Sequence, residues 1–323
     1  MDFLNIVFNI LTSGLPCCLL AIGVFLTFRL LDFADMTAEG SFLLGAALTA
    51  SCIYNGMNPF LATLLGMLIG VCCGIITGML NRLLKIPKLL SGIITLTASM
   101  SIAMLIMGIT RIDQIFATQV PLSLSGGHQT IYSIFYSSAL NQQFPGFPWN
   151  KLIETTVMIV VVLIVIFAIY YFFGTEYGMA IRATGMNEKM AKSQGINTNI
   201  SSIACVGISN GLIGLAGALY VQDALTVSTV SATGYLVIGL ASILIGEAIF
   251  GKRSFKNWLI SVTLGAILYF TIITIAIRLG FPTELKSLLY AILIAIALCI
   301  PLFRKGIQAI IKKFKRKEEK QTC

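Results

Sequence analysis

The sequence predicts an all-α polytopic membrane protein, because of its composition and its repeated apolar runs. Of its 323 residues, 57% are hydrophobic and 11% are charged, and the mean hydropathy is +0.92. A water-soluble domain with this balance would expose long apolar stretches to solvent. Apolar runs of about 20 residues, the length that crosses a bilayer as a helix, recur along the whole chain.

About nine membrane segments are predicted, two of them short. They run over 3–28, 41–54, 60–81, 89–110, 153–173, 200–221, 235–250, 257–279 and 287–303. We expect the first to remain as a span, because Asp2 stands where a signal peptide carries Lys or Arg. The second and seventh segments are shorter than a comfortable crossing.

The basic residues predict the orientation of these segments. Lys and Arg are concentrated in the loops at 82–88, 182–192 and 252–256 and in the tail, whereas the loops at 55–59 and 222–234 contain none. Since Lys and Arg accumulate on the cytoplasmic side, the N-terminus is predicted to lie outside and the C-terminus inside. At the cytoplasmic interface, Arg29 is expected to pair with Asp32.

This orientation divides the chain into two parts. The first is a single transmembrane domain, 1–303, with an extracellular region at 111–151 and a cytoplasmic loop at 176–199. The second is a basic amphipathic tail, 304–323, which we expect to lie in the cytoplasm and to bind anionic membrane lipid.

The two short segments begin with a similar pattern. Each has a small residue two positions before a glycine (Ala38 before Gly40, Ala232 before Gly234), and each has a further glycine five residues on. The segments are an odd number of spans apart, so the copies would face opposite ways, as in the inverted repeats that flank a transporter's substrate path. Chance similarity in a glycine-rich membrane protein is the alternative.

Polar and glycine residues near these segments are candidates for the substrate path. Hydroxyl and amide groups can line a path for a polar solute, although contacts between helices are their commoner use. The candidate path residues are Asp35, Glu39, Gly40, Thr95, Thr97, Asn210, Gly234 and Gly239.

The polar insert at 176–199 is the most informative stretch of the chain. A loop between two spans normally needs only a few residues, but this one is much longer and has helix-forming residues between Gly178 and Gly195. A connector that is long and folded usually contacts a partner. A solvated connector with a few basic residues is the alternative.

The sequence supports no enzymatic chemistry. The stretch from Gly246 to Lys252 matches the spacing of a phosphate-binding loop, but Arg253 stands where Ser or Thr must bind Mg²⁺. The eight cysteines are scattered without metal-ligand spacing, and we expect no metal and no cofactor in this chain. The net charge of +9 lies in loops and tail, where membrane topology puts it, so no nucleic-acid partner is expected.

The insert resembles the cytoplasmic coupling loop of the ATP-binding-cassette (ABC) importer permeases for branched-chain amino acids and ribose. The residues that carry the resemblance are Gly178, Ile181, Arg182, Ala183, Gly185, Asn187, Ala191, Gly195, Ile196 and Asn197, followed by Gly211, Gly214, Gly217 and Ala218. The stretch from Phe25 to Phe42 is similar to a subgroup paired with a surface lipoprotein, some members of which are linked to tryptophan or tyrosine uptake.

The resemblance implies a permease subunit in a bacterial plasma membrane that carries a small polar solute, most readily an aromatic amino acid. It implies two copies of the chain, two cytoplasmic ATPases that hold ATP and Mg, and a lipoprotein outside. It also implies a fold similar to the membrane subunit of the vitamin B12 importer, without that subunit's first helix.

In this family the coupling loop docks on the ATPase. Small residues are expected to allow close approach and polar ones to supply contacts. The loop residues are Glu176, Gly178, Arg182, Ala183, Gly185, Asn187, Glu188, Ala191, Gly195 and Ile196. An ion- or proton-coupled secondary transporter is the alternative function; it needs an acidic residue deep in the bilayer, and its best candidate, Glu247, lies near a cytoplasmic end.

Overall fold

The computed structural model describes residues 2–110, 122–124, 129–134, 149–229, 234–281, 288–289, 291–292 and 295. The longer elements are α1 (Asp2–Phe25), α2 (Thr37–Tyr54), α3 (Pro59–Arg82), α4 (Lys88–Thr110), α7 (Trp149–Phe172), α10 (Thr198–Ala224), α12 (Tyr235–Phe250) and α13 (Phe255–Arg278). The shorter ones are the π-helix η1 (Leu26–Leu30), α5 (Ile131–Ile134), α8 (Glu176–Met186), α9 (Glu188–Ser193) and the two-residue strands β1 (Leu122–Ser123) and β2 (Thr226–Val227).

The chain is helical, as predicted. The first eight predicted segments each coincide with a helix, but the ninth, 287–303, lies almost wholly outside the described residues. Six of the described helices, with α1 and η1 taken together, are long and apolar enough to span a membrane, and α12 is shorter. The prediction of nine segments is therefore not confirmed. The predicted tail, 304–323, and most of the region 111–151 also lie outside the described residues.

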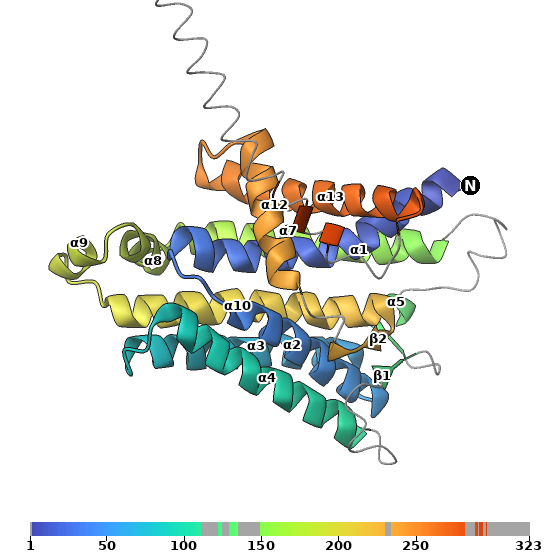
Figure 1. Cartoon of the computed structure of the whole chain (residues 1–323), viewed down its shortest axis with the longest axis horizontal. Coiled ribbons are helices and arrows are strands. Elements are labelled where there is room, and N and C mark those ends of the chain that lie inside the picture. The colour runs from blue at the N-terminus through green and yellow to red at the C-terminus, as the bar shows by residue number, and fades with distance from the viewer. Residues whose placement is uncertain are drawn as a thin grey trace, which may run out of the picture.

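Helices α1 and α10 occupy the middle of the molecule, and most of their described residues are buried. Helix α10 packs against α2 and α3, whereas α1 packs against α12, α13 and α7 (Figure 1). Each central helix therefore lies against the pair of helices that follows the other one in sequence. This exchange is the arrangement expected of two repeats that swap their first helices, and it supports the predicted repeat.

Glycines allow α3 and α10 to approach closely. A Cβ atom at Gly70 would lie 2.3 Å from the carbonyl oxygen of Asn210, and one at Gly74 would lie 2.3 Å from that of Val206. Small residues spaced four apart allow the backbones of two membrane helices to approach closely. Such packing stabilises the helix pair, because in lipid the hydrophobic effect does not drive helices together. The β1–β2 pair is antiparallel, with Leu122 opposite Val227.

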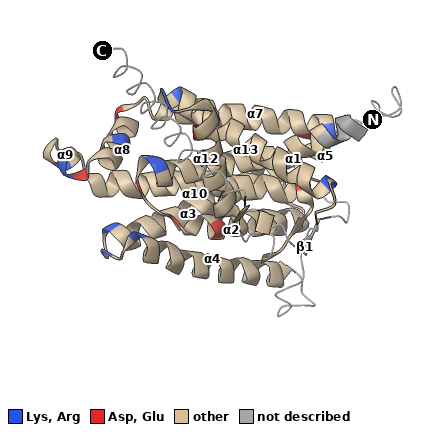
Figure 2. Cartoon of the chain, turned by 45° about the horizontal axis from the view of Figure 1, so that its top comes forward, with Lys and Arg blue, Asp and Glu red and all other residues tan. Residues whose placement is uncertain are grey.

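The two ends of the helical bundle differ in structure and charge. Helices α8 and α9 lie at one end, and the N-terminus, α5 and the β1–β2 pair lie at the other (Figure 1). Lys and Arg gather at the end that carries α8 and α9 (Figure 2). The insert is thus on the opposite side from the N-terminus, as the sequence predicts.

Candidate functional site

The insert folds as a hairpin of two helices, α8 and α9. The Thr175 hydroxyl caps α8 by accepting a hydrogen bond from the backbone N–H of Gly178. Asn187 ends α8 in an extended conformation, and its side chain caps α9 by accepting from the N–H of Met190 at 3.1 Å. A capping side chain satisfies one of the unpaired N–H groups at the start of a helix. Asn187 therefore sets the bend between the two helices.

One face of the hairpin packs on the chain itself. A Cβ atom at Gly185 would lie 1.6 Å from the carbonyl oxygen of Leu30, and one at Gly178 would lie 2.3 Å from that of Phe172. The side chain of Ala191 is buried and that of Ala183 is half-buried. We expected the small residues of the loop to allow close approach of the ATPase; at Gly178 and Gly185 the close neighbour is instead the chain's own backbone.

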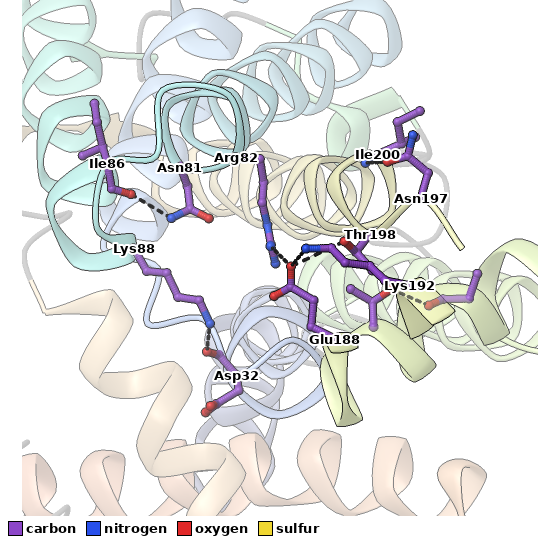
Figure 3. A network of polar contacts seen from close by, with 12 residues as sticks. Asp32, Asn81, Arg82, Ile86, Lys88, Glu188, Lys192, Asn197, Thr198 and Ile200 are labelled. Carbon is purple, nitrogen blue, oxygen red and sulfur yellow. Dashed lines mark hydrogen bonds and ion pairs between the residues drawn. The ribbon is translucent and has the colours of Figure 1, made fainter. Parts of the chain in front are cut away.

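Glu188 ties α9 to the end of α3 (Figure 3). Its Oε1 atom lies 2.8 Å from Arg82 Nη1 and 2.9 Å from Lys192 Nζ, and it accepts a 3.4 Å hydrogen bond from the Thr198 hydroxyl. The hydrogen bond from Lys192, together with the charges of Lys192 and Arg82, holds the pKa of Glu188 below its usual value. These contacts join α9, α3 and α10 at one carboxylate.

Arg182, another loop residue predicted to supply a polar contact, also has a partner within the chain. The Arg182 guanidinium lies over the ring of Phe255, 5.0 Å from its centre, at the start of α13. Gly195 ends α9 with a φ of +81°, a conformation that glycine adopts without strain. Ile196 follows half-buried, and Glu176 is exposed in the first turn of α8. The motif residues thus mainly shape the hairpin and anchor it.

The hairpin also exposes large apolar side chains on both of its helices. Tyr177 is 81% exposed, Met186 87% and Met190 59%. We call these three residues the hairpin face. Sequence reasoning missed them, although large apolar residues in an otherwise polar loop are a signal for a buried contact with a partner. Methionine suits such a contact because its side chain adapts to the opposing surface.

A second polar cluster joins the start of α2 to α10. The buried carboxylate of Asp35 accepts from the Asn210 side-chain amide at 2.6 Å and from the backbone N–H of Thr37 at 2.9 Å. The Ser41 hydroxyl donates to the carbonyl oxygen of the Asn210 side chain at 2.7 Å, and the hydroxyls of Thr37 and Thr77 are 2.8 Å apart. Two of the predicted path residues, Asp35 and Asn210, are therefore brought together as a buried helix junction.

Two other path candidates connect the short helices. The Glu39 carboxylate, on the first turn of α2, accepts from the backbone N–H of Gly234 at the start of α12 at 3.0 Å. Beside this contact, the ring of Phe42 stacks on that of Tyr235 at 4.0 Å, and Tyr220 of α10 meets Tyr235 edge-on. The two segments that the sequence pairs by pattern are thus in direct contact.

The remaining path candidates are not gathered with these. Gly40 faces Ser99 and Leu96 of α4, and Gly239 faces Val24 and Leu20 of α1. The final two candidates point apart on α4: Thr95 is buried and Thr97 is exposed, and each bonds to its own helix backbone. A common path lined by all eight residues is not what the monomer forms.

Arg29 pairs with Glu247 of α12, and the expectation that it pairs with Asp32 was wrong. The Nη2–Oε2 distance is 2.5 Å, and the other oxygen of Glu247 accepts from the Trp258 indole at 2.8 Å. The expectation failed because it considered only neighbours in sequence. With both oxygens engaged, Glu247 is a poor candidate for a proton carrier, which weakens the secondary-transporter alternative.

Comparisons with known proteins agree with this architecture. The family model described as "Branched-chain amino acid transport system / permease component" matches residues 6–298. A tyrosine transport system permease protein of Clostridioides difficile (strain R20291) is 31% identical over 290 residues, covering 90% of this chain and 89% of the relative. An uncharacterized protein of Rickettsia prowazekii (strain Madrid E) is 26% identical over 296 residues, covering 90% of this chain and 96% of that protein. No solved structure matches the chain, so similarity to the vitamin B12 importer stays a prediction.

Proposed function

The chain belongs to the family of permease components of branched-chain amino acid transport systems, and we propose that it is the membrane subunit of an ABC importer. In this proposal the chain performs no chemistry. It provides the path for the solute, while a separate ATPase binds ATP and Mg and supplies the driving force.

The single observation that carries this proposal is that the hairpin is both anchored and exposed. It is fixed to α3 through Glu188 and to the η1 backbone through Gly185. It also exposes the large apolar side chains of Tyr177, Met186 and Met190. A part that transmits motion needs both a rigid attachment to the moving helices and a surface for the part that drives them. The hairpin has both.

The proposed assembly contains two copies of this chain, two ATPases below the hairpins and a substrate-binding lipoprotein on the far side. The gathering of basic residues at the hairpin end supports a cytoplasmic position for the hairpins in a bacterial cell, with the N-terminus outside. When ATP closes the ATPases, the hairpins move with them. The helices attached to the hairpins then shift between inward and outward access.

An amino acid is the proposed substrate, with an aromatic one favoured. The relative from Clostridioides difficile is described as a permease of tyrosine transport. The contact between Glu39 and Gly234 lies beside three aromatic rings, those of Phe42, Tyr220 and Tyr235. A carboxylate beside aromatic faces suits an ammonium group attached to an aromatic side chain.

The test is a double charge substitution on the hairpin face, Met186→Glu with Met190→Glu. Placing carboxylates in an apolar contact removes anchors worth about 2 kcal/mol, so affinity for the ATPase should fall roughly thirtyfold. The variant should keep its thermal stability, because both side chains are exposed. Co-purification of the ATPase and transport into proteoliposomes should be lost together.

The control is Met57→Glu, which introduces one carboxylate at an exposed methionine in the turn between α2 and α3. This variant should retain the ATPase and transport. If the double variant hydrolyses ATP in response to substrate at the normal level, the hairpin is a connector and the proposal fails.

A further inference from the structure

A pocket of about 610 Å³ lies where α7, α8 and α13 meet, apart from the hairpin face and from the contact between the starts of α2 and α12. Its walls come from the last turn of α7, the cap of α8 and the first residues of α13. This volume is in the range of small-ligand sites. In Figure 1 the junction lies at the end of α7 that leads into α8, the end where basic residues gather in Figure 2.

The pocket is positively charged. Arg182 and Lys256 line it, and none of its described lining residues is acidic. In the described part of the chain neither cation takes part in an ion pair. Arg182 is half-buried and held over the Phe255 ring. Its guanidinium is therefore placed before any ligand arrives, which reduces the entropy lost on binding.

Hydrogen-bonding groups stand beside the two cations. Thr175 and Ser254, the caps of α8 and α13, both line the pocket. The N-terminal ends of these two helices therefore open toward it, and such ends carry partial positive charge that favours an anion. An anion with several oxygens, such as a phosphate group, has the geometry to accept from Arg182 while contacting Lys256.

The position of the pocket indicates that the phosphate belongs to a lipid headgroup. Tyr170 and Tyr171 directly precede Phe172, the last residue of α7, a helix long and apolar enough to span a membrane. Their side chains line the pocket and are 46% and 72% exposed. Tyrosines are stable at the level of lipid headgroups. We therefore expect the pocket to open at the level of the lipid headgroups.

We propose that this pocket binds the phosphate headgroup of an anionic phospholipid of the hairpin-side leaflet. The headgroup contacts Arg182 and Lys256, and the acyl chains continue along Tyr170 and Tyr171 on α7. A lipid in this position contacts the first turn of α8, next to Phe255.

The proposal is tested with the full chain in detergent, titrated with phosphatidylglycerol and observed by native mass spectrometry. Arg182→Gln with Lys256→Gln should weaken binding of one phosphatidylglycerol per chain at least tenfold, since each cation near a lipid headgroup adds about 1 kcal/mol. Lys85→Gln with Lys189→Gln, which removes two cations at the same end but outside the pocket, should leave that binding unchanged. Circular dichroism establishes that both variants are folded.

Phosphatidylcholine and soluble glycerol phosphate are used to distinguish an anionic lipid from a neutral lipid and from a free phosphate compound. Neither should occupy the site, the first because it has no net charge and the second because it has no acyl chains. Equal binding of phosphatidylcholine, displacement of the lipid by millimolar glycerol phosphate, or unchanged phosphatidylglycerol binding in the folded Arg182/Lys256 variant would each overturn the proposal.

Discussion

Asn210 is the residue on which the junction between α2 and α10 depends. Its side chain is fully buried and makes three hydrogen bonds, to Asp35, Ser41 and the carbonyl of Val206. Burying an unpaired polar group in a low-dielectric interior costs free energy. The polar groups of Asp35 and Ser41 therefore need Asn210 as a hydrogen-bond partner, and Asn210 needs them.

We expect Asn210→Ala to destabilise the protein by about 1–3 kcal/mol, because the change removes the amide donor of the Asp35 carboxylate and the acceptor of the Ser41 hydroxyl. Thermal unfolding in detergent measures the loss. Asn257→Ala is the control, since that side chain makes a single 3.4 Å hydrogen bond. Equal stability of the two variants would show that the junction around Asp35 is filled by other partners.

Glu188 gives the hairpin a dependence on pH. Its pKa is lowered in the folded chain, so the contacts with Arg82 and Lys192 stabilise the hairpin above the unfolded pKa of about 4.3 and weaken as the pH falls below that value. At neutral pH, Glu188→Gln should speed hydrogen exchange of the α9 amides about twofold to fivefold, the effect of losing a partly exposed ion pair.

Mass spectrometry of deuterium uptake provides the measurement for Glu188. As the pH falls through the lowered pKa of Glu188, the exchange rates of the wild type and Glu188→Gln should converge, because the wild-type carboxyl group then becomes neutral like the glutamine amide. Lys189→Gln, which removes an exposed charge next in sequence, should match the wild type at every pH. A difference between Glu188→Gln and wild type that persists unchanged at low pH would contradict the role of the ion pairs.

At the scale of elements, the hairpin is attached to the bundle by close backbone contact. Gly185 on α8 lies against the carbonyl of Leu30, at the end of the π-helix η1. The π-helix is a local change of helical register, and such changes often occur at functional sites. In the proposed mechanism, movement of α8 would therefore act directly on the segment that links α1 to α2.

Gly185→Ala should destabilise the permease by about 1–3 kcal/mol through overpacking, because the new Cβ atom would lie 1.6 Å from the Leu30 oxygen. Gly174→Ala, in the same connection, adds a Cβ atom 3.2 Å from the nearest atom and should change stability by no more than about 0.5 kcal/mol. Thermal unfolding compares the two. A stable Gly185→Ala would mean that α8 can lift away from η1 freely.

At the scale of the whole molecule, the two ends of the bundle should face different compartments. In a cysteine-free background, Ser193→Cys at the hairpin and Gln129→Cys at the opposite end are both exposed positions. An impermeant thiol reagent added to intact cells should label Gln129→Cys only, and Ser193→Cys should react only after the membrane is opened. Labelling of Ser193→Cys from outside would reverse the proposed orientation.

The sequence predicts the helices well because a membrane-spanning helix is encoded by contiguous apolar residues. The segments 60–81 and 89–110 agree closely with α3 and α4, and the paired short segments are in contact through Glu39 and Gly234. The start of α2 was predicted at 41 and lies at Thr37, since the polar residues of its first turn find buried partners.

The partners of the site residues could not be predicted, because they come from distant parts of the chain. Arg29 meets Glu247, which is 218 positions away, and Arg82 meets Glu188, which is 106 positions away. A motif shows which residues belong together in a loop, but not which side of the loop faces the rest of the protein. The exposed face around Met186 was missed for that reason.

The exchange of α1 and α10 also has a consequence for biogenesis. Asp35 is synthesised 175 residues before Asn210, which at about 5–20 residues per second is roughly 10–35 seconds earlier. During that interval the carboxylate has no amide partner, and the glycine-lined side of α3 has no helix to cover it. The early helices must therefore wait, shielded by the insertion machinery or held at the water interface, until α10 emerges from the ribosome and completes the first half of the protein.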